Sequence, residues 1–183
     1  MIYGFCGKES SGKTTCSRLL YYDLIAERGM DQVCRISFAD PLYSMCHTMF
    51  GYAGFMTKED YIRHPHLKEA LLEGVNKTPR QILLDVGACL RSIDEGIFIK
   101  LLDNAINKSV ANIFIIDDVR FTNEINYLKG KGAQIINVGD KSYRTLDDTE
   151  YCSGSVVYNS ERNLQALNNE LRSVINAPQK EEK

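Results

Sequence analysis

One run near the start of the chain has the residue types and spacing of a phosphate-binding site. The run G-K-E-S-S-G-K-T, residues 7–14, matches the pattern G-x-x-x-x-G-K-[ST]. Its glycines let the backbone curl so that successive N–H groups face one anion. Lys13 can then reach the β- and γ-phosphates of a nucleotide, and the Thr14 hydroxyl can bind Mg²⁺. The predicted nucleotide contacts are Gly7, Glu9, Ser10, Ser11, Gly12, Lys13, Thr14 and Thr15.

The loop must be held by a strand before it and a helix after it, and the sequence predicts both. Residues 1–6 have the pattern of a short buried strand, and after the loop Leu and Ile recur at helical spacing until Gly29. A helix that begins at the loop adds partial positive charge where a phosphate would bind. This context argues against a chance match in a Gly/Ser turn, so we expect a bound nucleoside triphosphate.

Strands alternate with helices along the rest of the chain, a pattern typical of a parallel sheet covered on both faces. Thr78 begins a predicted helix as its N-cap, with Pro79 at the first position and Gln81 closing a capping box. Further strands are predicted at 33–38, 113–116, 134–138 and 155–158, and further helices from Pro41 onwards and at 94–107, 122–131 and 162–175. The predicted fold class is therefore α/β, with a five-stranded parallel sheet flanked by helices.

The predicted organisation is a single domain over residues 1–177 with two segments that could cover a substrate. At residues 51–76 the pattern loosens, and aromatics, glycines and two short helical stretches predict a helical excursion. Residues 140–153 are polar and predict a lid-like loop, which would close with the excursion to exclude water. The polar end, residues 178–183, is predicted to be disordered.

The composition is that of a soluble globular protein and disfavours several classes of partner. The chain has 183 residues, 44% hydrophobic and 25% charged, with a net charge of −2. This charge offers no broad cationic surface for nucleic acid, and no apolar run is long enough to span a bilayer. The N-terminus has the pattern of a strand and not of a signal peptide. The six cysteines lack C-x-x-C pairing and the three histidines show no metal-binding pattern.

Polar residues follow several of the predicted strands, at the edge where parallel sheets bind ligands. Asp40 follows the second strand, and Asp117, Asp118 and Arg120 follow the strand at 113–116. An aspartate that ends such a strand in a phosphate-loop protein commonly holds Mg²⁺, directly or through water. Asp117 and Asp118 both qualify. One of them could instead merely cap the next helix, and we favour Asp118 for the site role at the metal.

Three arginines complete the group that could do chemistry. Transfer of a γ-phosphoryl group to a second phosphate gathers negative charge, which guanidinium groups hold in line and offset. Most arginines are solvated surface groups, but Arg80 lies in the first turn of a helix and Arg120 lies just beyond a central strand. We take Arg80, Arg91 and Arg120 as candidates for binding the transferred and accepting phosphates.

Taken together, the motifs of the chain resemble those of the deoxynucleoside monophosphate kinases of tailed bacteriophages, a branch of the phosphate-loop nucleotide kinases. The likeness rests on G-x-x-x-x-G-K-T-T at 7–15, F-A-D-P-L at 38–42, T-P-R-Q-I-L-L-D-V-G at 78–87 and D-V-R-F-T-N-E at 118–124. It continues around Phe98, at 131–133 and at Asn159, and so spans nearly the whole chain. The phosphate loop is shared with many unrelated enzymes, but its combination with the other motifs is much more specific.

The resemblance implies a phosphate-loop kinase fold and transfer of the γ-phosphate of ATP, with Mg²⁺, to a deoxynucleoside monophosphate. It implies that Asp40 lies near the acceptor phosphate or sugar and that Phe98 stacks on the base. The implied catalytic residues are Lys13, Asp40, Arg80, Arg91, Asp118 and Arg120, with Thr14 and Asp118 toward the metal. The implied substrate-binding residues are Asp40, Arg80, Gly87, Arg91, Phe98, Arg120 and Glu124.

The same resemblance implies that the partners are small molecules and neither nucleic acid nor a membrane. It also implies that the enzyme supplies deoxynucleotides in the cytoplasm, which is the host cytoplasm if the chain is phage-encoded. It leaves the oligomeric state open, a homodimer included. Several residues depart from the family pattern: Cys89 stands where aspartate is common, and Phe98 replaces a tryptophan. Residues 139–150 lack the usual arginine and H-x-S-E-like segment, so Arg144 is our candidate for the lid cation on ATP. The accepted bases therefore stay open.

Two other functions fit parts of the sequence. A small-molecule kinase such as a dephospho-CoA kinase would share the loop, the helical excursion and the parallel sheet. A nucleotide-dependent regulatory binder is the second alternative, but a GTPase needs an N-K-x-D motif. The nearest runs, at 76–79 and 107–110, both lack the aspartate.

Overall fold

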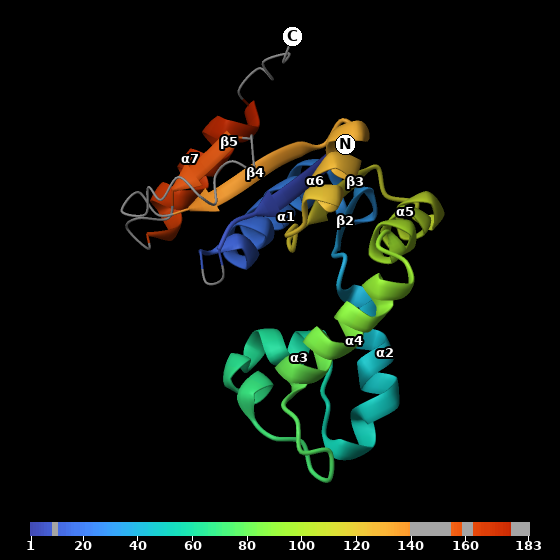
Figure 1. Cartoon of the computed structure of the whole chain (residues 1–183). Helices are drawn as coiled ribbons and strands as arrows, with labels where there is room; N and C mark the ends of the chain where they lie inside the picture. Colours follow the sequence, from blue (N-terminus) through green and yellow to red (C-terminus); the bar gives the residue numbers. More distant parts are fainter. Residues whose placement is uncertain (9–10, 140–154, 159–162, 177–183) are drawn as a thin grey trace. The chain divides into compact units, whose positions relative to one another are not determined.

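The computed structural model describes residues 1–8, 11–139, 155–158 and 163–176, and the chain forms two compact units. Met1–Ser37 and Ile106–Lys183 make up the first, which we call the sheet unit, and Phe38–Ala105 make up the second, the helical unit. In Figure 1 the strands belong to the sheet unit, and helices α2, α3 and α4 belong to the helical unit. The predicted excursion, residues 51–76, is the middle part of the helical unit, which also takes in the helices on either side of it.

The sheet is parallel throughout, with strand order β2-β3-β1-β4-β5. Its strands are β1 (Ile2–Cys6), β2 (Val33–Ile36), β3 (Ile113–Ile116), β4 (Gln134–Gly139) and β5 (Ser155–Tyr158). The register aligns Gly4 of β1 with Ile116 of β3 on one side and with Ile135 of β4 on the other. Strand β3, with the sequence I-F-I-I, is apolar throughout because parallel strands are buried on both faces.

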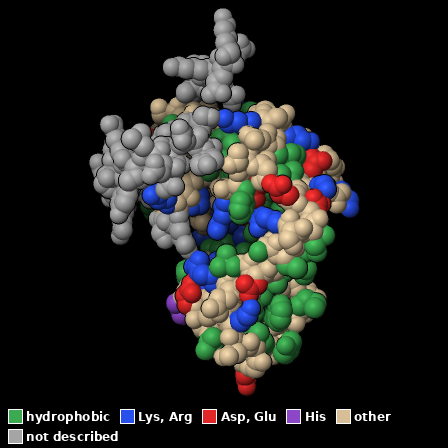
Figure 2. Space-filling model, viewed as in Figure 1, with side chains coloured by type: hydrophobic (Ala, Val, Ile, Leu, Met, Phe, Trp, Pro, Cys, Tyr) green, Lys and Arg blue, Asp and Glu red, His purple; other side chains and the backbone are tan. Residues whose placement is uncertain are grey.

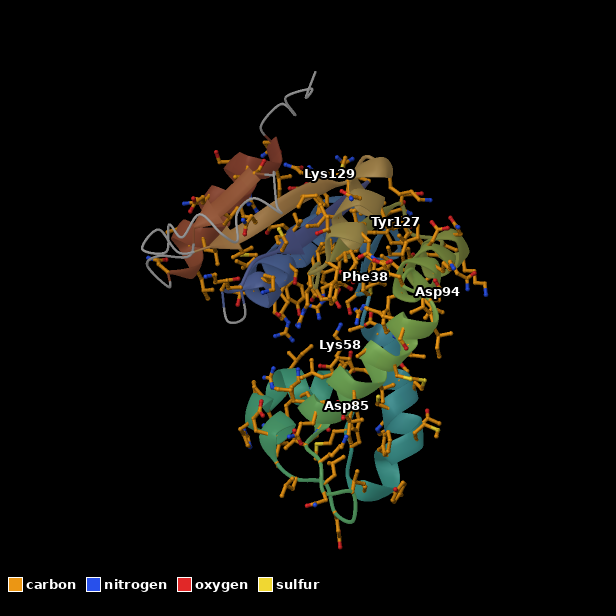
Figure 3. The ribbon with its side chains drawn as sticks, viewed as in Figure 1. Phe38, Lys58, Asp85, Asp94, Tyr127 and Lys129 are labelled. Carbon is orange, nitrogen blue, oxygen red and sulfur yellow. The ribbon has the colours of Figure 1, made fainter. Side chains whose placement is uncertain are left out.

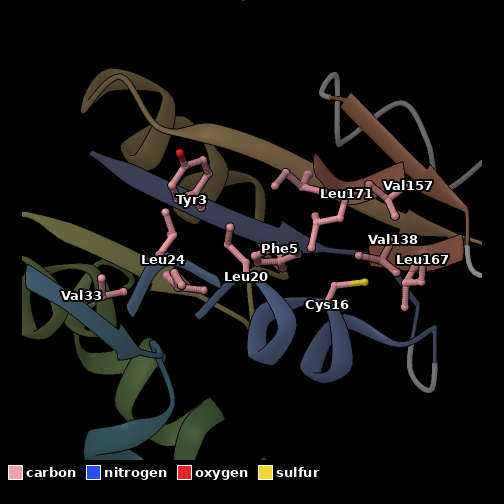
Figure 4. Packing of buried hydrophobic residues seen from close by; sticks show 12 residues of the cluster. Tyr3, Phe5, Cys16, Leu20, Leu24, Val33, Val138, Val157, Leu167 and Leu171 are labelled. Carbon is pink, nitrogen blue, oxygen red and sulfur yellow. The ribbon is translucent and has the colours of Figure 1, made fainter. Parts of the chain in front are cut away.

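Helices α1 (Lys13–Arg28) and α7 (Leu164–Asn176) cover one face of the sheet. Figure 4 shows the packing there, where Leu20 and Leu24 of α1 lie against Tyr3 and Phe5 of β1. This core is built from alternate residues of the strands and helical-period residues of α1 and α7: Tyr3, Phe5, Cys16, Leu20, Leu24, Val33, Ile115, Ile136, Val138, Val157, Leu167 and Leu171.

Helix α6 (Thr122–Gly130) lies on the opposite face. A Cβ added at Gly4 would come within 3.0 Å of both Ile135 Cδ1 and Leu128 Cδ1, so glycine lets α6 approach the central strand. Since α1 and α7 cover the other face, the prediction of an α/β fold with a parallel sheet flanked by helices is confirmed.

The helical unit is built from α2 (Asp40–Phe50), α3 (Lys58–Arg63), α4 (Pro79–Ile93) and most of α5 (Ile97–Lys108), with short 3₁₀ turns at Gly51–Ala53 and Pro65–Glu69. Tyr61 and Phe55 are fully buried in it with an edge-on ring contact at 5.4 Å. The predicted capping box at Thr78 is confirmed: its side chain accepts from the Gln81 N–H, and Gln81 accepts from the Thr78 N–H.

Element boundaries differ from the prediction where side chains form local turns. Helix α5 begins at Ile97, three residues after the predicted start, because the Asp94 carboxylate accepts a hydrogen bond from the Gly96 N–H at 3.1 Å. Strand β2 ends at Ile36, two residues early, and α7 begins at Leu164. The predicted lid at 140–153 and tail at 178–183 lie outside the described residues.

Burial separates the cysteines by chemical reactivity. Cys16, on the core-facing side of α1, is fully buried, and burial raises the pKa of its thiol to about 12, whereas Cys89 on α4 is exposed. At pH 8 only about one Cys16 thiol in 10⁴ is then ionised, and the thiolate is the reactive form.

We expect an aromatic disulfide reagent to modify Cys89 rapidly in the native protein and to leave Cys16 unmodified. The Cys89→Ser variant should lose one fast-reacting thiol, and an unchanged count of fast thiols in that variant would contradict the assignment.

Candidate active site

The strand order β2-β3-β1-β4-β5 places a topological switch point at the carboxyl ends of β1 and β3. These strands are neighbours, but the chain leaves β1 into α1 on one face of the sheet and leaves β3 toward α6 on the other (Figure 1). Adjacent loops that diverge in this way leave a crevice between them, which is where parallel α/β sheets bind ligands. The segments that border it are the predicted phosphate loop and the D-D-V-R run after Ile116.

The backbone of the loop takes conformations that favour glycine at both ends. Gly7 has φ +134° and Gly12, the N-cap of α1, has φ +103°. A Cβ at Gly7 would lie 2.3 Å from the Val138 carbonyl oxygen, so no side chain fits between the loop and β4. Gly12 places the first N–H groups of α1 at the loop, and no described side chain caps them. This arrangement suits an anion held by backbone N–H groups.

Replacing Gly7 with alanine should weaken ATP binding at least about tenfold, because the strained φ costs about 1–3 kcal/mol before the clash with Val138 is added. Gly132 provides a matched control: it also has a positive φ, +71°, but nothing lies within 4 Å of an added Cβ. Titration calorimetry with ATP should therefore separate the two variants. Equal ATP affinity in Gly7→Ala and Gly132→Ala would show that the loop does not form the nucleotide site.

Lys13 is folded back over the loop. Its Nζ donates to the Gly7 carbonyl oxygen at 2.7 Å and to the Lys8 carbonyl oxygen. A phosphate placed at the N–H groups of α1 would lie within the reach of this ammonium group. Ser11, Thr14 and Thr15 flank it in the loop and the first turn of α1, all partly exposed. Glu9, Ser10 and Arg144, the remaining predicted ATP contacts, lie outside the described residues.

Asp117 lies beside the first turns of α1. It is 8% exposed, its Oδ2 is 3.4 Å from the Ser17 Oγ, and the same oxygen is 3.7 Å from the Arg35 Nε. Ser17, itself fully buried, donates to the Thr14 carbonyl oxygen at 3.0 Å. The structure therefore brings Asp117 to the helix that carries Thr14, while Asp118, the favoured metal residue of the sequence, is only partly buried.

Glu124 holds the backbone that carries Arg120. Glu124 is 3% exposed, and its carboxylate accepts hydrogen bonds from the N–H groups of Arg120 at 2.9 Å and Phe121 at 3.1 Å. These contacts cap α6, so the structure gives Glu124 a structural task where the sequence predicted a substrate contact. The Arg120 side chain is exposed.

In the helical unit, two of the residues predicted to bind the acceptor make ion pairs. The Lys58 Nζ, labelled in Figure 3, lies 2.5 Å from the Asp40 Oδ1. The Arg80 Nε donates to the Glu69 carboxylate, with both side chains well exposed. An exposed pair such as Arg80–Glu69 contributes about 0–1 kcal/mol, so an anionic ligand could replace the Glu69 carboxylate.

The Arg91 guanidinium lies over the ring of Phe98. The Arg91 Cζ lies 4.5 Å from the centroid of the Phe98 ring, and the ring is 3% exposed. Gly87, one helical turn before Arg91, would bring an added Cβ to 3.4 Å from the Arg91 Nη1. The structure thus brings three of the predicted substrate-side residues together.

The sequence did not single out Arg35, Ser17 or Lys58. Strand alternation offered a signal for Arg35, since it lies two residues after Val33, whose side chain faces α1. Helical spacing offered one for Ser17, which follows Thr14 by three residues. Lys58 is separated from Asp40 by 18 positions, and no local pattern links them.

The charge distribution and the metal ligands set limits on what the site can bind. Both signs of charge appear on the face shown in Figure 2, consistent with the near-equal numbers of basic (22) and acidic (24) residues. Within the described part of the chain, no group of three or more His, Cys, Asp or Glu side chains could hold a metal ion. Mg²⁺ that arrives with a nucleotide keeps several waters and needs only one or two protein oxygens, which Thr14 and Asp117 can supply.

Comparison with models of known protein families finds no match, and comparison with curated proteins finds none either. Among the residues that the structure describes, no helix has the length and apolar character to cross a membrane.

Proposed function

We propose that this protein transfers the γ-phosphoryl group of ATP to a deoxynucleoside monophosphate, giving ADP and a deoxynucleoside diphosphate. The observation that carries the proposal is the phosphate loop between β1 and α1, with Gly7 and Gly12 at positive φ and Lys13 folded over its carbonyl groups. The motif combination in the sequence supports the choice of acceptor.

ATP would bind with its β- and γ-phosphates at the N–H groups of the loop and of the first turn of α1. Lys13 would leave the Gly7 carbonyl to pair with the phosphates. Thr14 and Asp117 would hold Mg²⁺, and we prefer Asp117 to Asp118 because of its position beside Ser17. When bound, Mg²⁺ neutralises charge on the β- and γ-phosphate oxygens.

The acceptor would bind to the cations of the helical unit. Arg80 and Arg91 carry guanidinium forks that suit a phosphate monoester, and Lys58 adds a point charge beside Asp40. Because Glu69 and Asp40 occupy two of these cations, the acceptor phosphate would replace carboxylates of similar charge and geometry.

In the reaction, an oxygen of the acceptor phosphate forms a bond to the γ-phosphorus. The bond from that phosphorus to the β–γ bridging oxygen breaks, and ADP leaves with its electron pair. No protein nucleophile is needed, because such transfer depends on positioning and on stabilising charge. Arg120 would stabilise the charge that develops on the transferred group.

An activity panel tests the proposal. The protein is incubated with Mg-ATP and each of the four deoxynucleoside monophosphates, their ribose counterparts and dephospho-CoA, and products are separated by ion-exchange chromatography. Formation of a deoxynucleoside diphosphate and an equal amount of ADP is expected. Phosphorylation of dephospho-CoA alone, or a blank panel with tighter binding of GTP than of ATP, would replace the proposal with one of its alternatives.

A further inference from the structure

The contact between Arg91 and Phe98 gives Phe98 a task other than binding a base. Arg91 lies in the last turn of α4 and Phe98 in the first turn of α5, and the guanidinium carbon is 4.5 Å from the ring centroid. This distance is well within the range of a cation–π contact. Since the ring is only 3% exposed, it has little surface left to offer a ligand.

Gly87 of α4 also lies next to the Arg91 guanidinium. Glycine is unfavourable inside a helix, and Gly87 is buried in the middle of α4, one turn before Arg91 on the same face. A Cβ there would lie 3.4 Å from the Arg91 Nη1 and 3.4 Å from the Leu42 Cδ2. These distances are those of van der Waals contact, so the Arg91 guanidinium lies directly against the Gly87 face of α4, with the Phe98 ring 4.5 Å away.

We propose that Phe98 is a positioning residue, whose ring orients the Arg91 guanidinium toward the acceptor phosphate instead of stacking on the acceptor base. The inference rests on the proposed kinase function. A guanidinium stacked on a ring by its face keeps its N–H donors in the plane, pointing outward, where they can bind two phosphate oxygens. Holding it in advance reduces the ordering that substrate binding would otherwise require.

This role makes a prediction that base stacking does not. Phe98→Leu should lower kcat/KM about 3- to 30-fold, the range of a cation–π contact, by the same factor for every accepted deoxynucleoside monophosphate. Arg91→Lys should lower kcat/KM for the same substrates, and adding Phe98→Leu to Arg91→Lys should cause little further loss. A residue that stacks on the base would instead change the ratio of purine to pyrimidine activity.

The test combines nuclear magnetic resonance of the free protein with the activity panel. The Arg91 Nε–H signal, identified by its loss in Arg91→Lys, should lie upfield from ring-current shielding and move downfield in Phe98→Leu. Leu102→Val is the control, because Leu102 is 2% exposed on the same face of α5, one turn further on. This control should leave both the signal and the base ratios unchanged.

A Phe98→Leu protein whose base ratios change tenfold, or whose loss multiplies fully with that of Arg91→Lys, would overturn the inference and leave the kinase function standing. An Arg91 signal that does not respond to Phe98→Leu would overturn it as well. Wild-type protein that shows no turnover across the panel would overturn the proposed function and, with it, the role of Arg91.

Discussion

Lys13→Ala should lower kcat for phosphoryl transfer at least about 10²-fold, the cost of losing one aligned charge or donor at a developing anion. The Lys13 amine lies 2.7 Å from the Gly7 carbonyl oxygen, at the loop where we propose that the phosphates bind. In the proposed transfer, which needs no protein nucleophile, this charge would account for a large share of the rate enhancement. Steady-state kinetics with saturating ATP and acceptor would measure the effect.

Lys13→Arg separates charge from geometry in the same assay. The guanidinium keeps the positive charge but is a planar fork and not a compact ammonium, so most of the activity should still be lost. Lys108→Ala, an exposed lysine at the end of α5, should retain wild-type kcat. A Lys13→Ala protein with kcat within twofold of the wild type would remove the loop from the mechanism.

Arg120→Ala should lower kcat about 10³-fold or more if the guanidinium acts on the transferred group in the transition state. The backbone of Arg120 is fixed by the buried Glu124 carboxylate, which accepts its N–H at 2.9 Å, while the side chain is exposed and can reach a ligand. Glu124 therefore fixes the position of the Arg120 backbone but makes no use of the Arg120 guanidinium in these two hydrogen bonds. The loss should appear mainly in kcat, with a smaller change in KM for ATP.

The matched control is Arg28→Ala, an exposed arginine at the C-terminal end of α1 that lines a pocket together with Gln32 and Asn112. It should turn over at the wild-type rate. Thermal unfolding of both variants should agree within a few degrees, because neither side chain is part of the core. Normal turnover in Arg120→Ala would refute the role assigned to this residue.

Most of the sheet could be predicted because its signals are local. The loop pattern with its flanking strand and helix, the apolar run of β3 and the capping box at Thr78 each depend on residues close together in sequence. The face of the sheet on which Asp117 lies could also have been predicted from the sequence. Ile115, two residues earlier, points toward α1, so alternation places Asp117 on that side and favours it over Asp118 beside the loop.

The contacts of the helical unit could not be predicted, because they depend on how separate helices pack. The stacking of Arg91 on Phe98 depends on the approach of α4 to α5, and the Lys58–Asp40 pair joins α3 to α2. Helical periodicity shows which residues share a face of one helix, but it does not show which neighbouring helix that face meets. Resemblance to a family suggested a base contact for Phe98, and only the packing revealed the cation on its ring.

The central claim is that one protein chain binds two nucleotides end to end, ATP by backbone N–H groups and the acceptor by guanidinium groups. Calorimetric titration with a bisubstrate analogue, in which adenosine and a deoxynucleoside are joined by five phosphates, tests it most directly. The analogue should bind with one-to-one stoichiometry and at least about 10²-fold more tightly than ATP, because the second contact becomes intramolecular. An analogue that binds no more tightly than ATP alone would contradict the claim.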